Sequence, residues 1–242
     1  NSSSSFLTLT LDGTLGDFGV FHQPVKFALR SEIAEQPMEI TPDARSLNTT
    51  GEGWYNIGAI EAQGDRDRKA LALELAVPVV SRLDVSLAGR IDNYSDASDI
   101  SGRFSGQMKL LYRVTDWLKL RGGYSQTFRA PDMFNIYGQS EGYATVADFS
   151  APGCFDGQTY VCGFSTVATT RRPDTGLTEE HGDDLGFGFI WQPVTNFMLT
   201  ADWYRIELQD LVVTETAYDT LLREWQCDNG VLDGSSQLCA DV

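Results

Sequence analysis

Four cysteines are the residues whose chemistry the sequence constrains most tightly. They form two local pairs, Cys154 with Cys162 and Cys227 with Cys239, in polar segments that contain glycine. Neither pair has the spacing of a zinc finger, and the two histidines of the chain do not complete a metal site. Short-range pairs in such segments favour disulfides formed in an oxidising compartment. We therefore predict two disulfides and no metal site, with free thiols as the alternative.

The other side chains that can do chemistry form no catalytic constellation. His22 and His181 lie far apart in the sequence, and neither belongs to a metal-ligand motif. The sequence contains no nucleophile elbow and no phosphate-binding loop. Neighbouring acids such as Glu179 and Glu180 would suit a calcium or acid–base site. Acidic residues are also common at junctions between loops and strands, where they are simply solvated. The sequence therefore predicts neither an enzyme nor a cofactor.

A long polar segment, 129–183, carries the aromatic side chains best placed to contact a ligand. Aromatic rings can stack on a bound molecule, and the glycines and acids around them are typical of an exposed loop. The alternative is that these rings pack the loop against itself around the Cys154–Cys162 pair. The candidate ligand contacts are Tyr137, Tyr143, Phe149, Phe155 and Tyr160.

The elements that must position these residues alternate apolar and polar side chains with a period of two, which indicates β-strands. Leu71, Leu73 and Leu75, for example, share one face of a strand whose other face carries Ala72 and Glu74. The segments with this pattern are 6–11, 25–33, 70–77, 83–92, 103–113, 118–125, 184–192 and 197–204. We predict an all-β, antiparallel fold with about eight long strands.

The connections between these segments alternate between short and long. Short turns fall near 23–24, 77–82, 114–116 and 192–196, and longer links fall at 34–68, 94–101, 129–183 and from 208 onward. Because each strand crosses to the opposite rim, this order puts the long links at one rim. Outer-membrane barrels have this arrangement, with short periplasmic turns and longer extracellular loops. A helix is predicted in the last loop over 217–226, with Thr216 as its N-cap.

The composition excludes a helical membrane protein and indicates what surrounds the polar face of the strands. The mean hydropathy is −0.22, and no apolar run approaches the roughly 18 residues that a membrane helix needs. The formal charge of −16 disfavours nucleic acid as a partner. Arg90, Lys109 and Arg121 lie on the polar face, and a dry core would not tolerate them unpaired. A water-filled or plugged lumen would accept them. A soluble all-β protein with a solvated polar face is the alternative.

Four sequence blocks carry a family resemblance. Phe128, Arg129, Ala130 and Pro131 follow the strand 118–125 and resemble the FRAP signature of TonB-dependent outer-membrane receptors. The segment 177–193 resembles the family's L-x-P-E block with Glu180 in the glutamate position, although Glu179 replaces the proline. The segments 197–208 and 70–80 are similar to two further strands of the family. These blocks occur in family order over nearly the whole chain.

The resemblance implies a barrel of roughly 22 strands with an N-terminal plug in its lumen. We therefore expect residues 1–242 to be part of the barrel domain, with the plug domain and the final strands absent from this chain. The implied function is energised uptake of a scarce or bulky nutrient across the outer membrane of a Gram-negative cell. The implied partners are outer-membrane lipid, TonB through the absent N-terminal region, and an unidentified substrate. A passive or structural outer-membrane barrel and a soluble carbohydrate-binding β-domain are the alternatives.

Overall fold

The computed structural model describes residues 3–16, 19–43, 45–46, 59–98, 100–149, 154, 162–232 and 239. The chain divides into two compact units. Unit 1 comprises Asn1–Glu39, Gln63–Tyr137 and Asp174–Val212, and unit 2 comprises Ile40–Ala62, Gly138–Pro173 and Val213–Val242.

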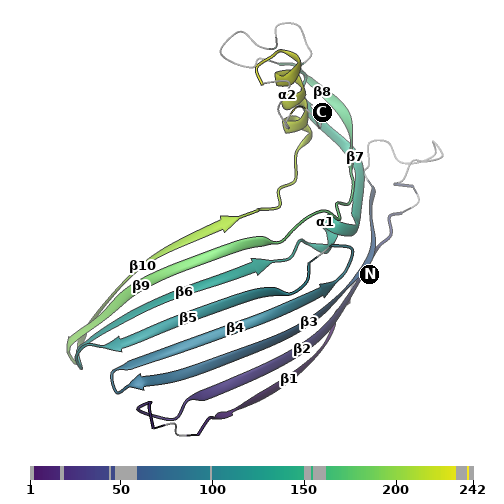
Figure 1. Ribbon diagram of the computed structural model, residues 1–242. Coiled ribbons are helices and arrows are strands. Elements are labelled where there is room, and N and C mark those ends of the chain that lie inside the picture. Colours follow the sequence, from purple (N-terminus) through teal and green to yellow (C-terminus); the bar gives the residue numbers. More distant parts are fainter. Residues whose placement is uncertain are drawn as a thin grey trace. The chain divides into compact units, whose positions relative to one another are not determined.

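Unit 1 is an antiparallel sheet whose strands follow the order β1-β2-β3-β4-β5-β6-β9-β10 (Figure 1). The strands are β1 (Ser5–Thr14), β2 (Lys26–Ile40), β3 (Ala59–Val80), β4 (Leu83–Ser95), β5 (Arg103–Arg113), β6 (Leu118–Arg129), β9 (Glu180–Val194) and β10 (Phe197–Gln209). These are the eight strands that the alternation predicts. The path ends at β1 and β10 without closing, so the sheet is a partial barrel.

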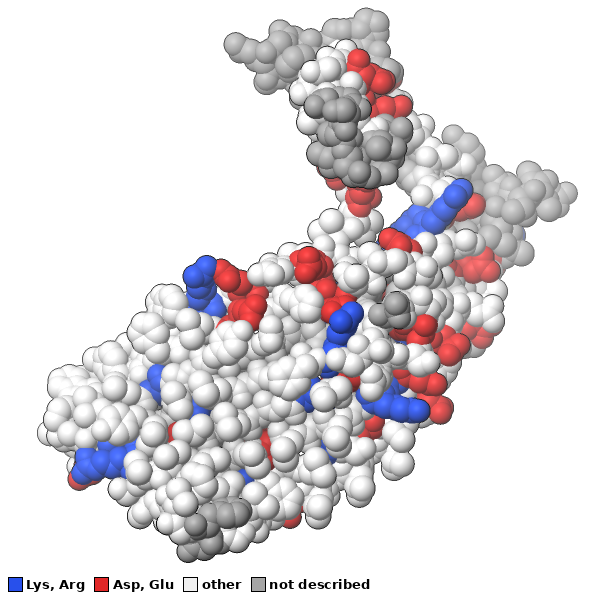
Figure 2. Space-filling model, viewed as in Figure 1, with Lys and Arg blue, Asp and Glu red and all other residues white. Residues whose placement is uncertain are grey.

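One face of this sheet is apolar and exposed. The strand register places apolar side chains side by side, so that Leu87 lies opposite Leu75 on β3 and Met108 on β5. Uncharged atoms predominate on the face of this sheet that is visible in Figure 2, and charged atoms gather toward the strand ends. The residues of this apolar face include Leu71, Leu73, Leu75, Val77, Val85, Leu87, Ile91, Met108, Leu110, Leu120, Leu185, Phe187 and Leu199.

The height of the apolar face fits the hydrocarbon layer of an outer membrane. On β4 the apolar positions run from Leu83 to Ile91, a distance of about 27 Å along the strand. With the tilt of about 40° that is usual in such barrels, the band is about 21 Å tall, close to the roughly 25 Å observed for membrane barrels. β3 has 22 residues, about twice the 9–11 that crossing requires.

Aromatic residues from three neighbouring strand ends meet at the rim of the short turns. Trp191 lies opposite Leu118 and packs edge to face on Phe197, with ring centroids 5.7 Å apart. The carbonyl of Trp117 accepts a hydrogen bond from Gln192 N at 2.7 Å. The turns here are short, with only Ser81 and Arg82 between β3 and β4. Aromatic girdles of this kind flank the apolar band of outer-membrane barrels.

Unit 2 contains the N-terminal end of β3, the strands β7 (Gly138–Ala147) and β8 (Phe164–Arg171), and the helix α2 (Ala217–Asp228). β7 pairs with residues 59–62 of β3 on one side and with β8 on the other. Thr216 caps α2 as predicted, because its side chain accepts a hydrogen bond from Asp219 N. Helix α2 packs against β7. Among the described residues, no helix is long and apolar enough to cross a membrane.

Three predicted connections differ from the structure. The link predicted at 34–68 is shorter, because β2 continues to Ile40 and β3 begins at Ala59. The long segment 129–183 contains the helix α1 (Met133–Tyr137) as well as β7 and β8. The turn predicted near 23–24 belongs to a longer link, 15–25. Alternation missed these elements because glycine, serine and threonine in strands such as β7 give little hydrophobic contrast.

Candidate functional site

The second face of unit 1, called the polar face below, carries charges that are paired across strands. The guanidinium of Arg121 on β6 donates to both carboxylate oxygens of Asp202 on β10, at 2.8 and 2.5 Å. The intervening residue on β9 is Gly188. A β-carbon at Gly188 would overlap Asp202 Oδ1 and lie 2.6 Å from the carbonyl of Ala201. This glycine is therefore required for the carboxylate to reach across β9.

A glycine-floored groove lies next to this ion pair. In one row across the sheet, Lys109 faces Gly123, Gly123 faces Gly186, and Gly186 faces Tyr204. The groove has a volume of about 510 Å³, and Asp184 contributes a carboxylate to its wall. Because two adjacent strands lack side chains here, the polar face is hollowed between a lysine and a tyrosine. Such a surface suits contact with a polar molecule or a polypeptide segment.

A second charged group on the polar face lies nearer the rim of the long links. The buried carboxylate of Glu32 on β2 accepts a hydrogen bond from Arg30 at 3.1 Å and from Arg68 on β3. Arg90 on β4 lies 3.6 Å from the same carboxylate and donates two hydrogen bonds to Asp92, at 2.7 and 2.8 Å. Three arginines thus share two carboxylates over three strands, so each of these charged groups contacts a group of opposite charge.

Arg66 forms the most deeply buried ion pair at the same rim. Its Nε lies 2.5 Å from Asp96 Oδ2, and the two side chains are 8% and 0% exposed. Arg66 Nη2 donates to the carbonyl of Pro131 at 2.8 Å, and the guanidinium lies 5.3 Å from the ring centroid of Tyr94. One side chain therefore joins β3, the link after β4 and the chain after β6.

The residues of the FRAP and L-x-P-E motifs come together at this rim. Phe128 packs edge to face on Tyr94 with a centroid distance of 6.2 Å. Arg129 Nε lies 3.3 Å from Glu180 Oε2, and the backbone N–H of Val212 donates to Glu180 Oε1 at 2.9 Å. Ala130 leads to Pro131, which is fully buried. The FRAP and L-x-P-E blocks are therefore joined by a carboxylate–guanidinium contact, and the same carboxylate holds the chain that leaves β10.

Glu179, which replaces the family proline, also has partners in the structure. Its carboxylate is buried, and Oε1 lies 2.7 Å from Arg103 Nε and 3.4 Å from His181 Nε2. Within the described part of the chain, no group of three or more histidine, cysteine or acidic side chains is arranged to hold a metal ion. The two adjacent acids therefore have separate partners: Glu179 binds Arg103, and Glu180 binds Arg129 and the backbone of Val212.

The aromatic ligand candidates lie in different environments. Tyr137 places its ring on Gly64, and its hydroxyl donates to Asp65 O at 2.8 Å and accepts from Ala97 N at 2.9 Å. Phe149 is buried and packs on Tyr218 of α2 at 5.2 Å. Tyr143 on β7 is half exposed. Phe155 and Tyr160 lie outside the described residues. A ligand contact by any of the five stays a prediction, and Tyr143 is the described candidate with an accessible ring.

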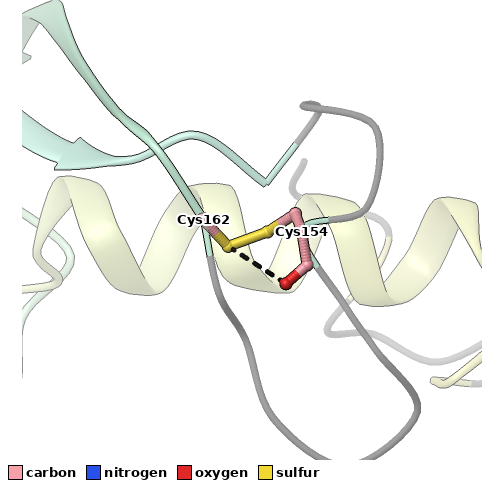
Figure 3. Close-up of a disulfide and its surroundings, with 2 residues drawn as sticks. All are labelled: Cys154 and Cys162. Carbon is pink, nitrogen blue, oxygen red and sulfur yellow. Dashed lines mark hydrogen bonds between the residues drawn. A yellow bond between two sulfur atoms is a disulfide. The ribbon is translucent and has the colours of Figure 1, made fainter.

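Both predicted disulfides are present. Cys154 and Cys162 are joined with their α-carbons 4.3 Å apart, and Cys162 Sγ also lies 3.7 Å from the carbonyl of Cys154 (Figure 3). Cys227 at the end of α2 is joined to Cys239. The prediction of local pairs from spacing is confirmed. Each of two separate loops of unit 2 is therefore closed by a disulfide bond.

Comparison with known proteins identifies the family. The family model described as "TonB dependent receptor-like, beta-barrel" matches residues 2–230. The chain belongs to this family. The resemblance drawn from the FRAP and L-x-P-E blocks is thereby confirmed, as are the barrel-type fold and the location of this TonB-dependent receptor barrel in the outer membrane of Gram-negative cells.

Curated relatives of this receptor barrel are named as hemin and siderophore receptors. The chain is 28% identical over 134 residues to a hemin receptor of Yersinia pestis, covering 53% of the chain and 19% of the relative. It is 25% identical over 161 residues to a probable TonB-dependent siderophore receptor, PirA, of Acinetobacter baumannii, covering 64% and 19%. The chain therefore spans about a fifth of the length of these relatives.

Solved structures show the same fold. The siderophore receptor PirA from Acinetobacter baumannii aligns with a TM-score of 0.58 and 15% identity, covering 87% of this chain and 28% of that one. The ferric enterobactin receptor PfeA, solved with BCV-L6, aligns with a TM-score of 0.57 and 17% identity, covering 86% and 27%. At these identities the likeness concerns the barrel fold alone.

Sequence reasoning did not single out the buried pair of Arg66 and Asp96 in this receptor barrel, because the segment before Lys69 was predicted as a loop. One signal was present. Residues 65–68 read Asp-Arg-Asp-Arg, which alternates charge with the period of a strand. That pattern places both arginines on one face, where the structure uses them to bind Asp96 and Glu32.

Proposed function

We propose that this chain is part of the barrel of an outer-membrane receptor that takes up a bulky, iron-bearing compound in a TonB-dependent manner. The observation that carries the proposal is the two-faced sheet of unit 1. Its apolar face suits lipid, and its polar face holds arginines in ion pairs that a hydrated or plugged lumen stabilises. The names of the relatives, which include hemin and siderophore receptors, support iron compounds as the substrate class.

In this proposal the barrel acts as a scaffold rather than as a catalyst. Lipid contacts the apolar face, and the paired charges of the polar face line the path of the substrate or of a plug. Tyr143 is the described loop residue offered for substrate contact, because its ring is half exposed while Tyr137 and Phe149 are packed against protein. TonB would supply energy through a part of the receptor outside this chain.

The proposal is tested with the full-length receptor in its own cell. We expect deletion of the gene to abolish growth on one iron source, either hemin or a ferric siderophore, when other iron is withheld. The gene should restore growth in a strain with TonB and fail to restore it in a strain without TonB. Growth that is restored equally in both strains would favour a passive barrel and contradict the proposal.

The loop assignment needs its own comparison. We expect Tyr143→Ala to weaken binding of the identified compound about fivefold, since loss of one aromatic stack removes on the order of 1 kcal/mol. Thr145→Ala, two residues along the same face of β7, is the matched control. Equal affinities for both variants and the parent would show that Tyr143 does not contact the substrate.

A further inference from the structure

The free side of β8 in unit 2 presents backbone groups that no described residue binds. Among the described residues, β8 pairs only with β7. The hydrogen bond from Asp148 N to Gly163 O at 2.8 Å sets the phase of the ladder. Since hydrogen-bonded positions alternate in an antiparallel pair, Ser165 and Val167 bond to β7. The residues whose backbone groups point away from β7 are Phe164, Thr166, Ala168 and Thr170.

The side chains along this edge do not protect it. Exposed edge strands usually carry a charge, a proline or a bulge that prevents another strand from pairing. The segment 164–170 has no charge and no proline, and its register with β7 is unbroken. Phe164 is 79% exposed. Within the described part of the chain, the edge is therefore free to accept an added strand over residues 164–170.

A half-exposed aromatic ring lies beside the middle of the edge. Tyr143 on β7 lies directly opposite Ala168 and shares a face with it. Because Ala168 carries only a methyl group, a side chain held across the edge from Ala168 can reach the half-exposed ring of Tyr143. At the C-terminal end of the strand, Arg171 is followed by the exposed Arg172. An acidic residue on the incoming strand would be favoured at that end.

We propose that β8 is a docking edge for an extended segment of another protein, which adds to the sheet as an antiparallel strand. Donors and acceptors that repeat about every 6.8 Å along a straight edge match an extended polypeptide backbone. The segment would carry an apolar residue opposite Ala168 and an acid toward its N-terminal end, which faces Arg172 in the antiparallel direction. This binding mode is separate from the uptake of a small iron compound.

The test uses the full-length receptor in detergent and a displayed library of random dodecapeptides as the probe. Selection on the parent receptor should enrich peptides that bind in extended form with an acid near their N-terminus. Ala168→Pro removes one free N–H of the edge, and proline is tolerated at such positions. We expect this variant to weaken binding at least tenfold, while Ala168→Ser, which keeps the N–H, leaves affinity within about twofold.

Hydrogen exchange on the same samples tests the geometry. Without peptide, the amides of Thr166 and Ala168 should exchange freely while that of Val167 is protected, and peptide should protect all three. The proposal is overturned if the two edge amides are already protected in the free receptor, or if no enriched peptide depends on the Ala168 N–H. If Val167 loses protection in Ala168→Pro, Thr170→Pro replaces it. Unchanged binding in a folded edge variant would equally overturn the proposal.

Discussion

Leu87 lies at the centre of the apolar face, so replacing it with arginine tests whether that face contacts lipid. It is four residues from both Leu83 and Ile91, which bound the apolar positions of β4. Four residues span about 14 Å along a strand, or about 10 Å along the membrane normal at the tilt of about 40° used above. Leu87 is therefore close to the bilayer midplane, where an arginine destabilises a membrane barrel by about 2–4 kcal/mol.

The adjacent residue supplies a matched control. Ala88 points to the polar face and lies opposite Glu74 on β3 and Gln107 on β5. Ala88→Arg adds the same charge to the same strand, but into a polar environment with a nearby carboxylate. We expect its effect on the free energy of unfolding to stay within about 0.5 kcal/mol, as for other solvated substitutions.

The assay is reversible denaturant unfolding of the full-length receptor barrel in phospholipid vesicles, compared among the parent, Leu87→Arg and Ala88→Arg. A difference of about 2 kcal/mol or more between the two variants supports the assignment of faces. Equal losses of stability would refute it. A larger loss for Ala88→Arg would mean that the polar face, and not the apolar one, is packed in a dry environment.

Three further substitutions test the contacts of the two units. Gly188→Ala should lower the free energy of unfolding by about 1–3 kcal/mol, because the added methyl displaces a hydrogen-bonded carboxylate. The control in the same unfolding assay is Gly122→Ala, whose added β-carbon would lie 3.6 Å from its nearest atom. Arg66→Met should lower it by about 3–5 kcal/mol because it leaves the buried Asp96 without its cation, whereas the double variant with Asp96→Asn should recover part of the loss. Removing Cys227–Cys239 by Cys227→Ser should destabilise α2 by about 3 kcal/mol, measured by exchange of helix amides.

Each of these outcomes can contradict its premise. Equal effects of the two glycine variants would mean that the carboxylate does not lie over β9. No recovery in the double variant would show that Arg66 acts through Pro131 and Tyr94 rather than through Asp96. Unchanged exchange in α2 after loss of the disulfide would show that the N-cap and the packing on β7 alone hold the helix.

Much of this fold could be predicted from patterns among residues that are close in the sequence. Period-two alternation predicts all eight strands of the main sheet, because a strand with different environments on its two faces must alternate. Cysteine spacing predicts both disulfides, since short loops bring such pairs within reach. The Thr216 cap is likewise local, because the hydroxyl and the helix N–H that it accepts are only three residues apart.

Elements without hydrophobic contrast were not predictable in this way. β7 and β8 consist largely of glycine, alanine, serine and threonine, so their pairing is fixed by backbone hydrogen bonds rather than by a buried apolar stripe. Residues 65–68 of β3 alternate acids and bases, which gives no apolar signal. Strand pairing at these places depends on the partner strand, and the partner is distant in sequence.

The sequence by itself determined which face of each strand is apolar and which cysteines pair, because these depend on neighbours within a few residues. Only the tertiary structure decided how the charges are compensated. Arg121 reaches Asp202, 81 residues away, across a glycine, and Arg66 joins Asp96 and Pro131, which lie in two separate links. Such contacts depend on strand register, which places distant residues side by side only when the sheet has formed.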